Sequence, residues 1–518
     1  MNTHSSLQNL CRVRIFTAFI SLIFSLQTVY FDDLINRDGI LYLQTAELFM
    51  ADGLYATQGL LNWPFFSILI SWVHQLTSLS LETAGFVLNG LLFILLTDAL
   101  VLISSLLVVT PRQLIIAAIL ILGFAPINEF RDFIIRDPGY WAFTSLALYH
   151  FILFLNSPSF KTATLWQAFM AIAILFRVEG SLLLLGLPLY LLFIRKPIEG
   201  LKQVAQSSYL LVIGITSAIT PLLNQPDLVS TFGKIHNIFN YLDLSSYATT
   251  LSVQTSIMQD QVLNKYSEDY AAFILITGML AMFMYKILKG FSISYLVIYF
   301  ITASRNLQPH AKNIQHLLLY FLALNALVLL AFLFKEYFIS VRYASMALIA
   351  LLLLVMHNVT DGIERLWLAK NKLLLSVIAL ALFYNVADMS TTSSSKKYIK
   401  DTAIWAANHL PRNSLIMTDD QFMLYYFNRE QPTSIVCVKN ILQKTAFTIR
   451  YENNALLNKD FCAAEKANDY NSYDYILVVE KERHPKLISF LKTLNLKRIY
   501  YQENTHLNDG ASVYKVIK

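Results

Sequence analysis

The chain is short of charge and of cysteine. Only 14% of its 518 residues are Asp, Glu, Lys or Arg, whereas soluble globular proteins carry about 25%. The three cysteines are too few for a disulfide framework or a zinc site. The sequence also lacks a basic stripe interleaved with aromatic residues, which is the footprint of nucleic-acid binding. These shortages exclude an ordinary soluble protein, a disulfide-rich secreted domain and a nucleic-acid-binding protein.

Several catalytic motifs are absent as well. The sequence contains no P-loop, no dinucleotide-binding glycine fingerprint, no H-E-x-x-H and no G-x-S-x-G. The corresponding nucleotide-binding, zinc-protease and serine-hydrolase sites are therefore not expected. We also find no internal repeat.

Apolar residues make up most of the chain instead. Apolar types account for 56% of residues, the mean hydropathy is +0.51, and apolar runs of roughly 17–25 residues recur, as bilayer spans require. Arg12 and Arg14 precede the first run, 15–31, which has no small-x-small cleavage site after it and is typical of a retained signal anchor. The pattern predicts a polytopic α-helical membrane protein.

Eleven spans fit the distribution of Lys and Arg, which concentrate in cytoplasmic loops. The predicted spans are 15–31, 84–109, 113–127, 140–156, 163–176, 181–194, 208–223, 270–287, 314–334, 340–357 and 373–388. Segments 64–78 and 291–303 are apolar but short, which favours interfacial or re-entrant helices. An odd span count places the N-terminus inside and the tail outside. If 291–303 crosses the membrane, that parity inverts.

The last part of the chain differs in composition from the rest. The sequence predicts a transmembrane domain over 1–389 and a small extracytoplasmic α/β domain over 390–518. Helical and strand-like segments alternate in this second domain, which predicts a partly parallel sheet. Cys437 and Cys462 lie in this tail and could pair in an oxidising compartment, but the sequence gives no distance between them.

The most informative polar segment is the predicted external loop 32–63. Asp38 lies in it shortly after the first span, and a guanidinium precedes it at Arg37, which would pair with the acid or bind phosphate. Tyr42 begins an i, i+4, i+7, i+8 apolar pattern, which indicates a short interfacial helix that stops near Gly53. The competing interpretation of Asp38 is a solvated loop residue.

Three further charged groups fall at predicted external span ends. Arg136 and Asp137 precede the fourth span, where Asp137 would otherwise serve as a helix cap before Pro138. A second group, Arg177 and Glu179, joins the fifth and sixth spans. The third group begins the tenth span. It consists of Arg342 and Tyr343, and an interfacial anchor is the competing interpretation.

Together these groups place two acids and several cations on one membrane face. An acid there can activate a hydroxyl or amine nucleophile, and cations can stabilise a leaving phosphate. That combination predicts glycosyl transfer from a lipid-linked phosphosugar. A transporter or flippase would place its charges nearer mid-bilayer. A third interpretation that the sequence leaves open is a non-catalytic protein with the same fold. The predicted external loop 224–269 is polar and could order over a bound substrate.

The motifs resemble those of GT-C integral-membrane glycosyltransferases, in the branch similar to bacterial protein O-mannosyltransferases and the lipid A aminoarabinose transferase. RDGILYLQTAELFMADGLY followed by WPFFSILISW resembles the first-loop pattern, with Asp38 as its acid. IIRDPGYWAFTSLALYHF resembles the second-loop acid, at Asp137. FRVEG and RYASMALIALLLL resemble the Arg/Glu turn and the late Arg-Tyr helix, although the prolines usual after the latter are missing. Many relatives carry Asp-Glu in the first loop, where this chain has Asp38-Gly39.

The resemblance implies a donor, a site and a location. The donor would be a polyprenyl-phosphate sugar, and Asp38 and Asp137 would be the catalytic acids. The residues implied in substrate binding are Arg37, Tyr42, Arg136, Arg177, Glu179, Arg342 and Tyr343. The location would be a bacterial inner membrane, with membrane lipids around the spans. Some relatives bind a divalent metal and others do not, so a metal stays open. The acceptor, whether protein, lipid A or glycan, is not readable from the sequence.

Overall fold

The computed structural model describes most of the chain. The described residues are 3–31, 34–224, 243–303, 309–390, 396–418, 420–431, 435–438, 470–482, 485–504 and 508–517. Cys462 lies outside them, so the predicted cysteine pair is not described. Part of the predicted loop 224–269 also lies outside.

The described chain divides into two compact units, one of which gathers segments far apart in sequence. The first unit comprises residues 1–27, 86–131 and 135–391, and the second comprises 28–85, 132–134 and 392–518. The predicted loop 32–63 and residues 132–134 therefore group with the tail. Each unit is described by itself below.

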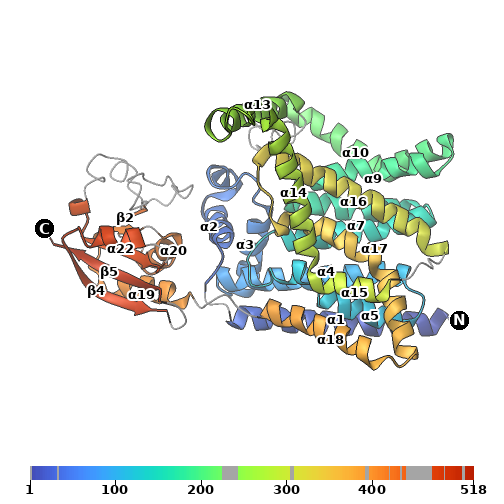
Figure 1. Cartoon of the computed structure of the whole chain (residues 1–518), viewed down its shortest axis with the longest axis horizontal. Helices are drawn as coiled ribbons and strands as arrows, with labels where there is room; N and C mark the ends of the chain where they lie inside the picture. Colours follow the sequence, from blue (N-terminus) through green and yellow to red (C-terminus); the bar gives the residue numbers. More distant parts are fainter. Residues whose placement is uncertain are drawn as a thin grey trace. The chain divides into compact units, whose positions relative to one another are not determined.

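Long apolar helices build the first unit, where α16 and α17 pack along each other (Figure 1). Their bounds are α1 Thr3–Phe31, α4 Leu81–Leu107, α5 Pro111–Leu122, α6 Ala125–Asn128, α7 Asp137–Asn156, α8 Phe160–Phe176, α9 Gly180–Ile194, α10 Pro197–Asn224, α13 Leu244–Gln261, α14 Ala271–Phe291, α15 Ile293–Thr302, α16 Pro309–Glu336, α17 Val341–Leu368 and α18 Lys372–Ser390. Both α1 and α4 cross the division between the units.

Five helices among the described residues are long and apolar enough to cross a membrane. They are Gln8–Tyr30, Leu81–Leu107, Glu268–Phe291, Lys312–Glu336 and Val341–Leu368. Ten of the eleven predicted spans lie mostly within a single helix, because an apolar run can satisfy its backbone in lipid only by forming one, whereas the predicted span 113–127 is divided between α5 and the four-residue α6. A multi-pass membrane protein is therefore supported, while eleven spans, their orientation and the crossing by 291–303 stay predictions.

One predicted loop is partly helical. Within 224–269 the described residues form α13, which Asp243 caps by accepting a hydrogen bond from the Ser245 amide at 3.0 Å. Residues 268–270 form a short 3₁₀ turn, η2. The composition rich in Ser and Thr suggested a loop, but a capped segment can form a helix when it packs on α14 and α16.

In the second unit, the predicted loop 32–63 contains the expected helix. Helix α2 spans Arg37–Ala56 and loses helical geometry at Gly53, whose φ of +78° is left-handed. A 3₁₀ turn η1, Thr57–Gly59, and helix α3, Phe65–Thr77, follow. The ring of Tyr42 is buried edge-on against Phe66, with centroids 5.1 Å apart. The predicted apolar face thus packs α2 onto α3.

The tail folds as a five-stranded sheet with helices on both faces. Its elements are α19 Lys397–His409, β1 Leu415–Thr418, α20 Gln421–Glu430, β2 Ile435–Val438, η4 Tyr470–Ser472, β3 Tyr475–Glu480, α22 Pro485–Leu491, β4 Leu496–Glu503 and β5 Gly510–Val516. The strand order is β2-β1-β3-β5-β4. Strands β2, β1 and β3 are parallel, and β5 is antiparallel to both of its neighbours.

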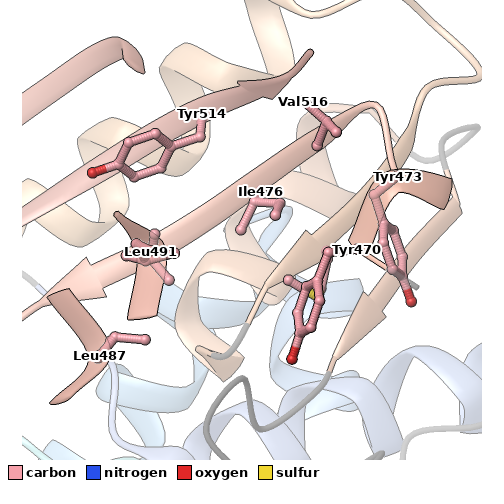
Figure 2. Close-up of a cluster of buried hydrophobic side chains, with 9 residues drawn as sticks. Tyr470, Tyr473, Ile476, Leu487, Leu491, Tyr514 and Val516 are labelled. Atoms are coloured by element: carbon pink, nitrogen blue, oxygen red, sulfur yellow. The ribbon is translucent and has the colours of Figure 1, made fainter. Parts of the chain in front are cut away.

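A hydrophobic cluster holds α22 on one face of this sheet (Figure 2). Its buried members are Met417, Tyr470, Tyr473, Ile476, Val478, Leu487, Leu491, Tyr514 and Val516. Alternate residues of β3 and β5 enter it because successive strand side chains point to opposite faces. On the other face, Trp405 of α19 stacks on Tyr500 of β4 with centroids 4.1 Å apart.

Candidate functional site

The first unit gathers charged groups from three predicted loops. Arg177, the residue after α8, donates from Nη1 to Asp137 Oδ1 and from Nη2 to Glu179 Oε1, the latter at 2.8 Å. Arg342 in the first turn of α17 brings its Nε within 3.9 Å of Asp137 Oδ2. The ring of Tyr343 lies 5.0 Å from the Arg177 guanidinium carbon and 5.3 Å from that of Arg342.

This arrangement depends on how α7 begins. The helix starts at Asp137, and Pro138 follows. Proline suits the first helical turn because amide groups there have no partner within the helix, so its missing N–H costs nothing. Arg136 occupies the cap position, so Asp137 is the first helical residue and its carboxylate faces Arg177. A Cβ on Gly139 would lie 2.3 Å from a ring atom of Phe176, at the end of α8. Glycine thus permits the close approach that brings Asp137 to Arg177.

We call Arg136, Asp137, Arg177, Glu179 and Arg342 the arginine cluster. It contains three cations and two carboxylates among the described residues, which leaves one positive charge in excess. The Asp137 side chain is only 3% exposed and that of Arg177 11%. The Nη1 atom of Arg136 is buried and has no hydrogen-bond acceptor among the described residues. Unpaired buried donors beside excess positive charge favour an anionic ligand.

The charge of Glu179 is fixed by its partners. Burial raises its pKa, but the positive charge and hydrogen bonds of Arg177, with the charge of Arg136, outweigh burial and lower the pKa to about 2. The group is therefore ionised at neutral pH. Arg177 thus bridges two carboxylates, and Asp137 bridges two arginines.

The second unit holds Arg37, Asp38 and Tyr42, all on α2. Arg37 is exposed and Asp38 is half-buried in the first helical turn, where the helix dipole favours a carboxylate. Tyr42 is buried in the packing against α3. Asn36, immediately before the helix, receives a hydrogen bond from the Ile134 amide at 2.8 Å and donates to the Ile134 carbonyl at 3.4 Å. This reciprocal pair of hydrogen bonds fixes the start of α2 to the segment that precedes α7.

The same contact between Asn36 and Ile134 explains why a glycine follows Asp38. A Cβ on Gly39 would lie 2.8 Å from Asn36 Oδ1 and 3.2 Å from Ile134 Cβ. Ile134 is fully buried, and its side chain also lies 3.1 Å from where a Cβ on Gly85 would be. A side chain at position 39 would therefore have to displace Asn36 or Ile134.

The described residues do not fit a divalent metal. No group of three His, Cys, Asp or Glu side chains within the described ranges is arranged to hold one. In the arginine cluster, the carboxylate oxygens of Asp137 and the Oε1 of Glu179 face guanidinium groups instead.

Comparison with solved structures identifies the fold. The arabinofuranosyltransferase AftD from mycobacteria superimposes on 98% of this chain with a TM-score of 0.50 and 11% identity, and the match covers 40% of AftD. The chain has the GT-C glycosyltransferase fold. At this identity the likeness concerns the GT-C fold alone, and this chain spans less than half of AftD's length.

Two further solved structures match with lower TM-scores. The oligosaccharyltransferase AglB from Archaeoglobus fulgidus, in complex with an inhibitory peptide and a dolichol-phosphate, gives a TM-score of 0.44 at 11% identity over 96% of this chain and 74% of its own. ArnT from Cupriavidus metallidurans gives 0.39 at 12% over 99% and 98%. No family model and no curated protein matches the sequence.

The sequence supports two residues of the predicted external loop 128–139, Arg131 and Asp132, less strongly than it supports Asp137. Arg131 is 2% exposed and donates to Asn128 Oδ1, Ser21 O, Ser21 Oγ and Ser25 Oγ at 2.7–2.9 Å, so it holds that loop against α1. Asp132, the next residue, has a buried carboxylate oxygen. The sequence does not reveal that these two side chains are buried, because burial of a loop side chain leaves no periodic signal.

Proposed function

We propose that this chain is a glycosyltransferase of the bacterial inner membrane that moves a sugar from a polyprenyl-phosphate donor to an acceptor at the outer face. The arginine cluster is the observation that carries the proposal. Its excess positive charge and the unpaired Nη1 of Arg136 suit the phosphate of such a donor. The GT-C fold supports the same assignment by analogy.

Within the cluster, Asp137 positions the arginines in this proposal. Its carboxylate is already engaged by Arg177 and approached by Arg342, so a substrate proton would compete with two cations for it. Arg136, Arg177 and Arg342 would contact the phosphate, and the Tyr343 ring keeps two guanidinium groups in place through cation–π contacts. Glu179 would orient Arg177 from its other side.

Asp38 is the proposed general base. It would accept the proton of an acceptor hydroxyl while that oxygen bonds to the anomeric carbon of the sugar. The bond from that carbon to the phosphate oxygen would break, and polyprenyl phosphate would leave with the electron pair. The arginines would stabilise the charge that develops on the leaving phosphate. The exposed Arg37 beside Asp38 would remain available to a phosphate or an acceptor carboxylate.

Transfer measured with the purified full-length protein tests this function. Radiolabelled sugars on polyprenyl phosphate would be presented singly, with hydroxyl-bearing lipids, peptides and glycans as acceptors. The proposal expects transfer with at least one pair, and expects that Arg342→Gln raises the donor KM at least tenfold. Arg365→Gln, near the opposite end of α17, is the matched control because Arg365 is exposed and pairs with Asp361 one turn earlier on the same helix. Release of free sugar to water alone, or no turnover with any pair, would contradict the proposal.

A further inference from the structure

Asp132 has a buried carboxylate oxygen without a partner. Its Oδ1 is inaccessible to solvent and receives no hydrogen bond from the described residues. Its neighbour in sequence, Arg131, directs its guanidinium to Asn128, Ser21 and Ser25. The charged side chain that acts on Asp132 in its own unit is Lys396, just before α19.

The hydrogen bonds between Asn36 and Ile134 fix the segment that carries Asp132. Asp132 lies two residues before Ile134, whose amide and carbonyl are both bonded to Asn36. Asn36 in turn lies two residues before Asp38, the proposed base, and all four residues belong to the second unit. The loop that carries Asp132 is therefore attached to the start of the helix that carries Asp38.

Burial has the expected effect on this carboxyl group. Burial raises the pKa of Asp132 to about 6, against the smaller opposing effects of a backbone hydrogen bond and of Lys396. The group is still mostly ionised at pH 7.5. An ionised oxygen kept from water without a donor destabilises the free protein, and such a group is retained most readily when a ligand supplies the donor.

We propose that Asp132 forms part of the acceptor-binding site, where its Oδ1 accepts a hydrogen bond from a hydroxyl group of the acceptor. This inference rests on the proposed function, since it names the acceptor side of the same reaction. The residue binds and orients, while the proton removed in the reaction goes to Asp38. Lys396 already provides a positive charge nearby, which favours a neutral hydroxyl over an ammonium group.

Asp132→Asn is the central test because it keeps the shape and removes the charge. A residue that only maintains the fold should destabilise the protein when it is changed. A residue kept for a ligand should do the opposite in the free protein, because the substitution removes a buried, unpartnered charge. Asp52→Asn is the matched control, since Asp52 is exposed on the same helix as Asp38.

The thermal midpoint of the purified full-length variants would be measured without substrate from pH 5 to pH 8. We expect Asp132→Asn to raise the midpoint at pH 7.5 and to flatten its fall between pH 5 and pH 7, with Asp52→Asn unchanged. Arg37, Asp38 and Lys396 are present in all variants, so the difference isolates Asp132. A lower midpoint for Asp132→Asn at pH 7.5 would overturn the inference.

Substrate measurements complete the test. With a hydroxyl acceptor that supports transfer, Asp132→Asn should raise the acceptor KM at least tenfold and leave the donor KM within about twofold. An unchanged acceptor KM would overturn the inference. If Asp132→Asn impaired transfer only to an amine acceptor, the assignment of a hydroxyl group as the ligand of Asp132 would be wrong. If the wild type transfers no sugar to any acceptor, the proposed function fails. The role of Asp132 is then tested by binding alone, with the same acceptors added to the thermal unfolding measurement. A hydroxyl compound that raises the unfolding midpoint of the wild type but not that of Asp132→Asn supports the role of Asp132, and the lack of any such compound contradicts it.

Discussion

Removing Arg177 should be among the most damaging single changes in the first unit. Arg177→Met keeps much of the side-chain volume and removes the guanidinium that bonds Asp137 and Glu179. Asp137, 3% exposed, would keep only the approach of Arg342 at 3.9 Å. A buried carboxylate that loses its main partner is left largely uncompensated.

The magnitude follows from burial. Breaking a buried ion pair by removing one partner costs about 3–5 kcal/mol. Glu179 adds less, because its side chain is 32% exposed and solvent screens the loss to about 1 kcal/mol or below. The cation–π contact with Tyr343, at 5.0 Å, adds a similar amount. Since these effects overlap, we expect a total destabilisation of about 3–5 kcal/mol.

Equilibrium unfolding in mixed micelles would measure this cost. Arg365→Met is the matched control, because Arg365 is 53% exposed in its pair with Asp361 and should contribute about 0.5 kcal/mol or less. Adding Asp137→Asn to Arg177→Met removes the stranded charge and should recover about 2 kcal/mol. If Arg177→Met costs no more than Arg365→Met, or if the second substitution recovers nothing, the buried network is not what holds these groups.

Three further predictions concern packing and pH. Gly139→Ala should destabilise by about 1–3 kcal/mol, because its Cβ would lie 2.3 Å from Phe176, whereas Gly278→Ala, with open space around it, should not; unfolding midpoints compare the two. Asn36→Ala should cost about 1–3 kcal/mol by the same measurement, since it leaves the buried backbone groups of Ile134 without their partner. Glu179 has a lowered pKa, so its stabilising contribution is complete above about pH 4.5 and is lost as pH falls towards 2. Unfolding midpoints between pH 6 and pH 3 should fall more steeply for the wild type than for Glu179→Gln, and parallel slopes would argue against the pairing.

Much of the helical architecture could be read from the sequence because hydropathy has a direct physical cause in a membrane. Most apolar runs coincide with a single helix, and the interfacial pattern from Tyr42 predicts α2, with the break at Gly53. Helix α13 was not predicted, since its Ser- and Thr-rich sequence has weak periodicity and its helix depends on a cap and on packing. The number of spans cannot be counted from helices alone.

In the tail, alternating patterns predicted the helices and the strands up to β4. Strand β5, Gly510–Val516, was missed because it begins with glycine and carries a lysine, so it looks like a polar terminus. Its strand character comes from pairing with both β3 and β4, which no local pattern records. The parallel pairing of β1 with β2 and β3 fits the predicted partly parallel sheet.

The candidate site was predictable as a list and less so as an arrangement. Predicted topology placed Asp137, Arg177 and Arg342 on one face, and the structure brings them into contact. The sequence did not reveal that Asp137 is shared by two arginines, because side-chain partners depend on helix contacts such as Gly139 against Phe176. Nor did it distinguish Asp132 from its charged neighbours, since that distinction depends on burial.

The catalytic role of Asp38 is the central claim, and one measurement tests it most directly. Asp38→Asn in the purified full-length protein should lower kcat for transfer from polyprenyl-phosphate sugar by at least about a hundredfold, the size expected for loss of a general base. The unfolding midpoint and the donor KM should stay close to wild type, as they should for Asp52→Asn. Full transfer activity in a normally folded Asp38→Asn protein would contradict the account.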